Sequence, residues 1–216
     1  RIETLAQELE LAIHLHLHET ADEISQGRDR HGKRPYRHMV DLGLAGPHLQ
    51  TVHMTQLESQ EIDDLALHGI HVAHCPESNM KLASGVCPAA QLLAAGVNIA
   101  LGTDGAASNN NLDMFGTMRA AALLAKVAGK PTDLPAWQVL EAATLGGARM
   151  LTREAELDSI EPGKRADLTA VDLSGPTTQP VYDPISTLVY AGSGADVSHT
   201  WVGGQAVYAL GRTTNI

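Results

Sequence analysis

Aromatic residues are scarce in this chain: Phe, Trp and Tyr together make up 3% of its 216 residues. A core must therefore be built mainly from Ala, Leu, Val and Ile side chains. Long apolar runs are also missing, since none reaches the roughly 20 residues needed to cross a bilayer, and the first residues show no secretory signal pattern. Basic residues are outnumbered, with 15 Lys and Arg against 25 Asp and Glu and a formal net charge of −10. This charge argues against a nucleic-acid partner, because phosphates require a basic surface.

Cysteine is nearly absent as well. The two cysteines, Cys75 and Cys87, do not form a C-x-x-C pair. This usage predicts two reduced thiols in a cytoplasmic protein rather than a disulfide framework.

The length of 216 residues also falls short of a familiar architecture, because a complete (β/α)8 barrel typically needs about 250 residues. The chain starts at Arg1, without Met, inside a segment of helical character at 2–10. We therefore expect it to be a piece of a longer protein. Its 44% hydrophobic and 19% charged content is typical of a soluble globular protein.

Four apolar, strand-like runs each lead to a residue that can bind a metal or move a proton. Segments with helical character separate them, and this alternation is typical of parallel strands joined by helices. In such folds the chemistry collects at the carboxyl ends of the strands, where side chains converge. The runs are 11–17 with His16 near its end, 49–52 leading to His53, 70–73 leading to His74, and 97–103 leading to Asp104. The order His, His, His, Asp predicts a metal-dependent hydrolase.

The remaining pattern divides the chain near residue 152. In the α/β part, 1–152, we expect helices at 56–68, 88–95 and 114–127, another from Pro135 to about residue 151, and a loop followed by a helix within 20–44. The part at 153–216 favours β structure, with a strand at 166–173 and a hairpin at 200–207 over Gly203-Gly204.

Three histidines alternate along the first run: His14, His16 and His18. On a strand, all three can face the same side. Burying three imidazoles without partners would be costly, which favours a metal ligand among them, and we expect it to be His16. Glu19 follows where the strand should give way to a loop. It could be a general acid beside the metal, or an acidic residue that complements the dipole of the next helix.

The later strand ends offer further candidates. We expect His74, which precedes a Cys-Pro pair, to support its loop. Asp104 lies in a Gly-Thr-Asp-Gly stretch, where Asp-Gly also fits an ordinary turn. A carboxylate at this position also suits a metal ligand: one oxygen can hold the cation while the other accepts a proton from metal-bound water.

Four motifs together resemble the amidohydrolase superfamily. They are H-L-H-E-T from His16, V-H-M-T from Val52, H-C-P-E-S-N-M-K-L from His74, and L-G-T-D-G-A-A-S-N-N from Leu101. Within the superfamily, the chain is most similar to the 5′-methylthioadenosine/S-adenosylhomocysteine deaminases, and the likeness runs through nearly its whole length. The resemblance implies an α/β fold: strands five to eight of a (β/α)8 barrel, which is its second half, followed by a small β segment of a composite sandwich.

The resemblance also implies a role for each matching residue. His16 matches a metal-binding His and Glu19 a substrate-contacting Glu, while His53 matches a His that polarises the attacked centre. Asp104 matches the Asp that binds the metal and serves as base, and Ser108 falls at a position close to the substrate. The implied reaction is hydrolytic deamination of an adenine nucleoside, in which metal-bound hydroxide attacks C6 and ammonia leaves. The implied cofactor is one zinc, with iron or manganese as alternatives, because imidazole and carboxylate suit several metals.

One part of the family pattern is missing. The family's first strand carries an H-x-H pair that supplies two further metal ligands, and we reject His14 and His16 as that pair because too few strands would then precede Asp104. We therefore expect the N-terminal half of the barrel as a partner, and we expect exposed strand edges to favour a homo-oligomer. Two alternatives stay open: an amidohydrolase acting on guanine, a triazine or another aminated heterocycle, and a non-catalytic half-barrel.

Overall fold

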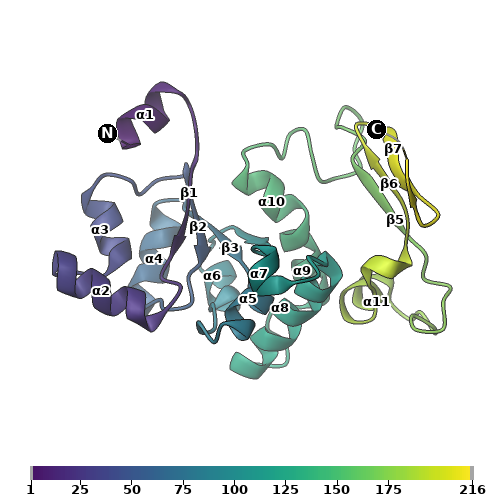
Figure 1. Cartoon of the computed structure of the whole chain (residues 1–216), viewed down its shortest axis with the longest axis horizontal. Helices are drawn as coiled ribbons and strands as arrows, with labels where there is room; N and C mark the ends of the chain where they lie inside the picture. The colour runs from purple at the N-terminus through teal and green to yellow at the C-terminus, as the bar shows by residue number, and fades with distance from the viewer. Residues whose placement is uncertain (1, 215–216) are drawn as a thin grey trace.

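The chain forms two separate four-stranded sheets (Figure 1), in a computed structural model that describes residues 2–214. Neighbouring strands run parallel in the first sheet, ordered β1-β2-β3-β4, and antiparallel in the second, ordered β5-β6-β7-β8. The strands are β1 (Ile13–Leu17), β2 (Leu49–His53), β3 (His71–His74), β4 (Ile99–Leu101), β5 (Leu168–Val171), β6 (Val197–Val202), β7 (Gln205–Ala209) and β8 (Arg212–Thr213). The expected parallel α/β arrangement and the hairpin over Gly203-Gly204 are confirmed.

Helices connect the parallel strands and continue after them. They are α1 (Ile2–Glu8), α2 (Ala21–His31), α3 (Pro35–Asp41), α4 (Ser59–Leu67), α5 (Pro76–Lys81), α6 (Ala89–Ala94), α7 (Ala106–Asn109), α8 (Met114–Ala128), α9 (Ala136–Ala143), α10 (Leu145–Met150) and α11 (Pro184–Tyr190). The helices expected at 56–68, 88–95 and 114–127 are confirmed as α4, α6 and α8. None of the helices in residues 2–214 is long and apolar enough to span a bilayer.

Two connections differ from the sequence expectation. The segment expected to begin as a loop forms α2, because Thr20 caps it: its Oγ1 accepts a hydrogen bond from the Glu23 amide at 3.2 Å. The single helix expected from Pro135 to about 151 is broken at Thr144, whose Oγ1 donates to the Leu140 carbonyl. The break lets α10 lie against β4. A side chain at Gly146 would prevent this, since a Cβ there would lie 2.1 Å from the Ile99 carbonyl oxygen.

The part after residue 152 is not purely β. Helix α11 returns to pack against α8 and α9, and the guanidinium of Arg119 on α8 donates to the Gly192 carbonyl at 2.7 Å. The division near residue 152 therefore stays a prediction. The outermost positions of the two expected parts, Arg1 and Ile216, lie outside the described residues.

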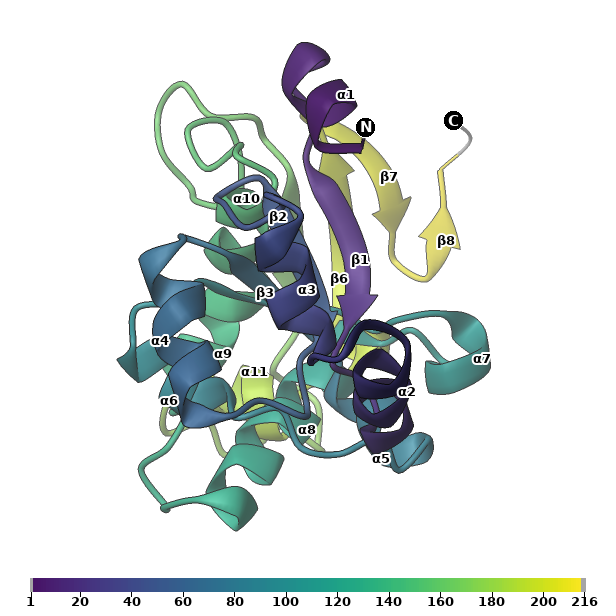
Figure 2. The same cartoon turned by 90° about the vertical axis from the view of Figure 1, so that its left-hand side faces the viewer.

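The register of the parallel sheet sorts its side chains onto two faces. His14 pairs with Gln50 and His16 with Val52, so these four residues share one face. A small apolar cluster, consisting of Val52, Ala73, Cys75, Ala100 and Met150, lies among the residues of this face. The main core lies on the other face, where Leu17, Leu49, Val72 and Ile99 pack under the helices. The carboxyl end of β1 points toward α2, α5 and α7 (Figure 2).

His18 does not share a face with His14 and His16, so that expectation is wrong. Its φ of 52° is left-handed, which ends the strand alternation, and its side chain is fully buried. The Tyr36 amide donates to Nε2 at 3.0 Å, and Nδ1 lies 3.7 Å from a carboxylate oxygen of Glu61. Burial lowers the pKa of His18 to about 4, although the negative charge of Glu61 opposes the shift. His18 is therefore a neutral core residue.

The buried, neutral His18 predicts an acid-labile fold. Its pKa is about 4 in the folded state and near 6.5 when unfolded, so the unfolded state binds the proton first as the pH falls. We expect this residue to remove about 2 kcal/mol of the free energy of unfolding between pH 7.5 and pH 5. Urea unfolding of the full-length protein measures the loss. The His18→Gln variant should lose less on acidification, and an unchanged pH dependence in that variant would contradict the assignment.

Candidate functional site

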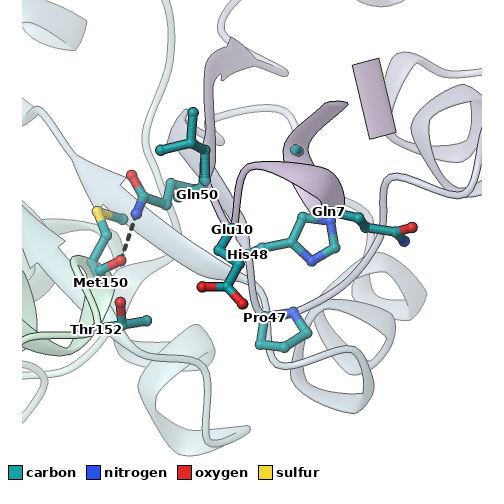
Figure 3. A pocket seen from close by; sticks show the side chains of 10 residues that line it. Gln7, Glu10, Pro47, His48, Gln50, Met150 and Thr152 are labelled. Atoms are coloured by element: carbon teal, nitrogen blue, oxygen red, sulfur yellow. Dashed lines mark hydrogen bonds between the residues drawn. The ribbon is translucent and has the colours of Figure 1, made fainter. Parts of the chain in front are cut away.

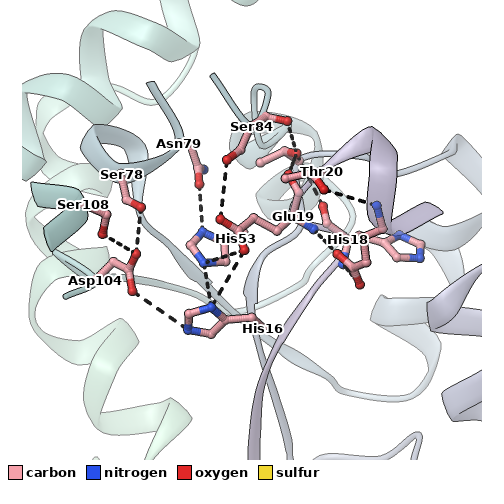
Figure 4. Close-up of polar contacts among 12 residues, drawn as sticks. His16, His18, Glu19, Thr20, His53, Ser78, Asn79, Ser84, Asp104 and Ser108 are labelled. Atoms are coloured by element: carbon pink, nitrogen blue, oxygen red, sulfur yellow. Dashed lines mark hydrogen bonds and ion pairs between the residues drawn. The ribbon is translucent and has the colours of Figure 1, made fainter. Parts of the chain in front are cut away.

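Four of the residues singled out in the sequence converge at the carboxyl ends of β1, β2 and β4 (Figure 4). His16 stands at the centre of the group. Its Nε2 lies 3.9 Å from Asp104 Oδ1, and its Nδ1 lies 3.9 Å from Glu19 Oε2 and 3.1 Å from His53 Nε2. The His16 side chain is 53% exposed, so this centre opens away from the helices. Two imidazoles and two carboxylates that lie this close to one another, with contacts of 3.1–3.9 Å around His16, can bind a metal or transfer protons.

The orientation of His53 is fixed by contacts on both of its ring nitrogens. Strand alternation would place its side chain on the same face as Leu49 and Thr51, but its φ of 75° ends that alternation. Its ring meets the His16 ring edge-on, with centroids 4.5 Å apart and planes at 82°. His53 Nδ1 lies 2.8 Å from Asn79 Oδ1, while Nε2 faces His16 and, at 3.8 Å, Glu19 Oε2. The side chain is fully buried, so these groups are its polar surroundings.

Asp104 presents one oxygen to the site and has the other occupied. Ser78 Oγ and Ser108 Oγ both donate to Oδ2, at 2.7 and 2.6 Å. Burial by itself raises the pKa of Asp104, but the hydrogen bonds from Ser108, Ser78 and the Gly105 amide outweigh it and hold the pKa below its ordinary value. Asp104 is therefore a carboxylate whose Oδ1 is left to face His16.

Glu19 is fixed through its backbone as well as its side chain. Its amide donates to Glu23 Oε2 at 2.6 Å, and Thr55 Oγ1 donates to its carbonyl at 2.7 Å. Ser84 Oγ contacts Oε1 at 3.4 Å. The acidic residues in the first turn of α2 are Asp22 and Glu23, so the alternative role of complementing the helix dipole falls to them. The carboxylate of Glu19 remains directed at the two histidines.

His74 and Cys75 lie beneath the site. Burial, followed by the nearby His53, lowers the pKa of His74 to about 4, so it is neutral at physiological pH. Within residues 2–214, its buried Nδ1 has no hydrogen-bond partner. Burial, followed by the charge of Asp104, raises the pKa of Cys75 to about 12, which excludes a thiolate at neutral pH.

The donor set fits a metal ion of the zinc type. Zinc binds imidazole nitrogen and carboxylate oxygen at about 2.0–2.2 Å, so two of its ligand atoms can be separated by at most about 4 Å. The 3.9 Å between His16 Nε2 and Asp104 Oδ1 satisfies this limit. A second grouping also satisfies it: His16 Nδ1, Glu19 Oε2 and His53 Nε2 lie 3.1–3.9 Å from one another. Both groupings include His16.

Sequence reasoning missed the residues that support these groups. Ser78 and Asn79 are both buried, and each hydrogen-bonds one of the residues that the sequence singled out. Ser84 was missed too. The available signal was position: Ser78 and Asn79 lie in the segment that follows the carboxyl end of β3, where the same rule that pointed to His53 and Asp104 applies.

A pocket lies at the end of the sheet opposite these residues (Figure 3). It has a volume of about 280 Å³. It is lined by α1 and the residues after it, by Pro47, His48 and Gln50, and by the end of α10 with Thr152. Gln50 crosses its floor and donates to the Met150 carbonyl at 2.5 Å. The four convergent residues do not line it, so it is separate from the candidate site.

The chain is similar in sequence to known deaminases. The chain is 50% identical over 206 residues to a 5-methylthioadenosine/S-adenosylhomocysteine deaminase of Teredinibacter turnerae, covering 95% of this chain and 47% of that protein. It is 49% identical over 194 residues to a 5′-deoxyadenosine deaminase of Methanothermobacter thermautotrophicus, covering 89% of this chain and 45% of that protein. The chain thus spans about half the length of the curated relatives it matches.

Two solved structures that contain zinc share this fold over about half of their length. An adenosine deaminase from Xanthomonas campestris with bound zinc superposes with a TM-score of 0.98 at 48% identity, over 100% of this chain and 49% of that one. An atrazine chlorohydrolase from Arthrobacter aurescens complexed with zinc superposes with a TM-score of 0.89 at 28% identity, over 97% and 47%. The amidohydrolase family model matches residues 2–207. The chain belongs to the amidohydrolase family.

Proposed function

We propose that the protein containing this chain is a zinc-dependent hydrolytic deaminase of adenine nucleosides such as 5′-methylthioadenosine or S-adenosylhomocysteine. The observation that carries the proposal is the convergence of His16, Glu19, His53 and Asp104 at the carboxyl ends of β1, β2 and β4. The names of the relatives and the zinc in the Xanthomonas campestris structure support it.

The residues of this chain divide the proton transfers among them. His16 and Asp104 would hold the zinc, which as a Lewis acid makes water a nucleophile at neutral pH. Asp104 takes up the proton of the attacking water, and Glu19 donates a proton to the purine ring. His53 polarises the attacked centre, and Ser108 contacts the substrate beside Asp104. The proton taken up by Asp104 passes to the amino group, which leaves C6 as ammonia, and Glu19 regains its proton as the C6 hydroxyl becomes the carbonyl of the product.

Two zinc ligands from one chain are fewer than the three protein ligands usual in catalytic zinc sites. We therefore propose that the other ligands come from a further part of the protein, corresponding to the half of the relatives that this chain does not match. The proposed location is the cytoplasm, supported by two cysteines that are both free and buried. Assembly as a homo-oligomer stays a prediction.

The substrate class is tested by ammonia release from the full-length protein. We expect turnover of 5′-methylthioadenosine, S-adenosylhomocysteine or adenosine. The two carboxylates of Glu19 and Asp104, each 3.9 Å from the His16 imidazole, support proton transfer at an adenine ring. Guanine and an aminotriazine are the comparison substrates. Release from these two alone would replace the nucleoside assignment, and release from none of the five would support the non-catalytic alternative.

The role of Asp104 predicts a selective loss of turnover. Asp104→Asn keeps the shape and the contacts with Ser78 and Ser108 but removes the base, so kcat should fall by about 10³-fold while the melting temperature stays close to that of the wild type. Asp172→Asn is the matched control, because Asp172 also accepts a hydrogen bond from a nearby serine but is exposed and follows β5 in the other sheet. Wild-type kcat in Asp104→Asn would rule out its proposed role.

The zinc assignment predicts one zinc ion per site, and it predicts that binding of this ion requires His16. Metal analysis of purified full-length protein should show zinc, a chelator should remove both zinc and activity, and His16→Ala should lower the zinc content. His14→Ala is the control, because His14 lies on the same face but hydrogen-bonds Gln50 instead. Equal zinc content in the two variants would contradict His16 as a ligand. Reconstitution with iron or manganese tests the alternative metals.

A further inference from the structure

Asn79 stands out because it is a buried amide with a single polar contact through its side chain. It is 1% exposed and lies on α5, directly behind His53. Oδ1 lies 2.8 Å from His53 Nδ1, whereas Nδ2 has no hydrogen-bond partner among residues 2–214. A buried, unpaired amide donor costs about 1–3 kcal/mol. Such a group calls for an explanation other than stability.

The contact with Asn79 determines which nitrogen of His53 carries the proton. An amide oxygen only accepts, so Nδ1 of His53 must be the donor, and Nε2 of the neutral ring presents a lone pair. Nε2 lies 3.1 Å from His16 Nδ1, which can then donate to it. That arrangement leaves the lone pair of His16 Nε2 facing Asp104 Oδ1 at 3.9 Å. One amide thus sets the proton positions of two successive imidazoles.

We propose that Asn79 is a positioning residue that holds His53 as its Nδ1–H tautomer, so that His53 Nε2 accepts from His16 Nδ1 and the lone pair of His16 Nε2 is presented to the site. Its neighbour Ser78, on the same short helix, donates to Asp104 at 2.7 Å, so α5 supports two strand ends at once. Partners that orient imidazole ligands in this way typically change activity or metal affinity by 10–100-fold when removed. The catalytic part of this inference rests on the proposed function; the tautomer part does not.

The decisive variant is Asn79→Leu, which keeps the branched shape and removes the acceptor. Because the side chain of Asn79 makes no other hydrogen bond among the described residues, the variant should lose only its bond to His53 and should also remove an unpaired buried amide. We expect kcat for 5′-methylthioadenosine to fall 10–100-fold with KM within about twofold. The melting temperature should stay close to that of the wild type, because the unpaired His53 Nδ1 left behind offsets the removal of the unpaired amide.

The matched control is Asn98→Leu at the opposite end of the same strands. Asn98 also pairs with a histidine, its Nδ2 lying 3.0 Å from His71 Nδ1, and it donates to the Gly146 carbonyl at 2.9 Å. The Asn98–Gly146 hydrogen bond joins the start of β4 to α10, so its removal should lower the melting temperature and leave kcat within about twofold. A purely structural Asn79 would behave like Asn98, and that result would overturn the proposal.

A second readout is independent of turnover. Nitrogen-15 labelling of histidine in zinc-loaded full-length protein reports the tautomer of each ring, with the His53 signals assigned by their loss in His53→Gln. We expect the Nδ1–H form of His53 in the wild type and in Asn98→Leu, and its loss in Asn79→Leu. An Nε2–H form in the wild type, or a tautomer unchanged in Asn79→Leu, would overturn the proposal. If no nucleoside is turned over but the tautomer result is as expected, the proposed function fails and the positioning role stands.

Discussion

The candidate site depends on the in-register, parallel pairing of the first four strands. Because Leu17 pairs with His53 and His74 with Leu101, the carboxyl ends of all four strands lie along one edge of the sheet. Side chains far apart in the sequence, such as His16 and Asp104, therefore come within 3.9 Å. The packing of Leu17, Leu49, Val72 and Ile99 against the helices maintains this edge, since the other face of the sheet carries only the small apolar cluster.

At this edge the backbone leaves the strand conformation in an energetically unfavourable way. His18, His53 and Asp104 have φ values of 52°, 75° and 61°, in the left-handed region that costs a residue with a side chain about 1–2 kcal/mol. Hydrogen bonds to these turns offset the cost. The Thr55 and Gln56 amides donate to the His18 carbonyl, and two serine hydroxyls donate to Asp104. The turns redirect His18 into the core and His53 toward His16.

The short helix α5 connects this edge to the helices that follow β4. Glu77 accepts hydrogen bonds from Asn109 on α7 and Thr117 on α8, at 2.9 and 2.8 Å. Lys81 donates to the Ala107 carbonyl at 2.8 Å and also contacts Asn110. Ser108, which lies between these contacts, is thereby kept within reach of Asp104. Of the groups proposed to carry the chemistry, His53 and Asp104 are thus supported by residues of one neighbouring helix, α5.

The sequence by itself determined several helices, one hairpin and the residues that converge at the candidate site. Apolar periodicity located α4, α6 and α8, Gly203-Gly204 located the β6–β7 hairpin, and the carboxyl-end rule with the family motifs pointed to His16, Glu19, His53, Asp104 and Ser108. These features depend on near neighbours in the chain. Only the tertiary structure decided that His18 is buried, that the helix after Pro135 breaks at Thr144, and that Ser78 and Asn79 support Asp104 and His53. The reason is physical: a hydrogen-bond partner is set by which backbone segments approach each other, and that approach is fixed only when the sheet and its helices have packed.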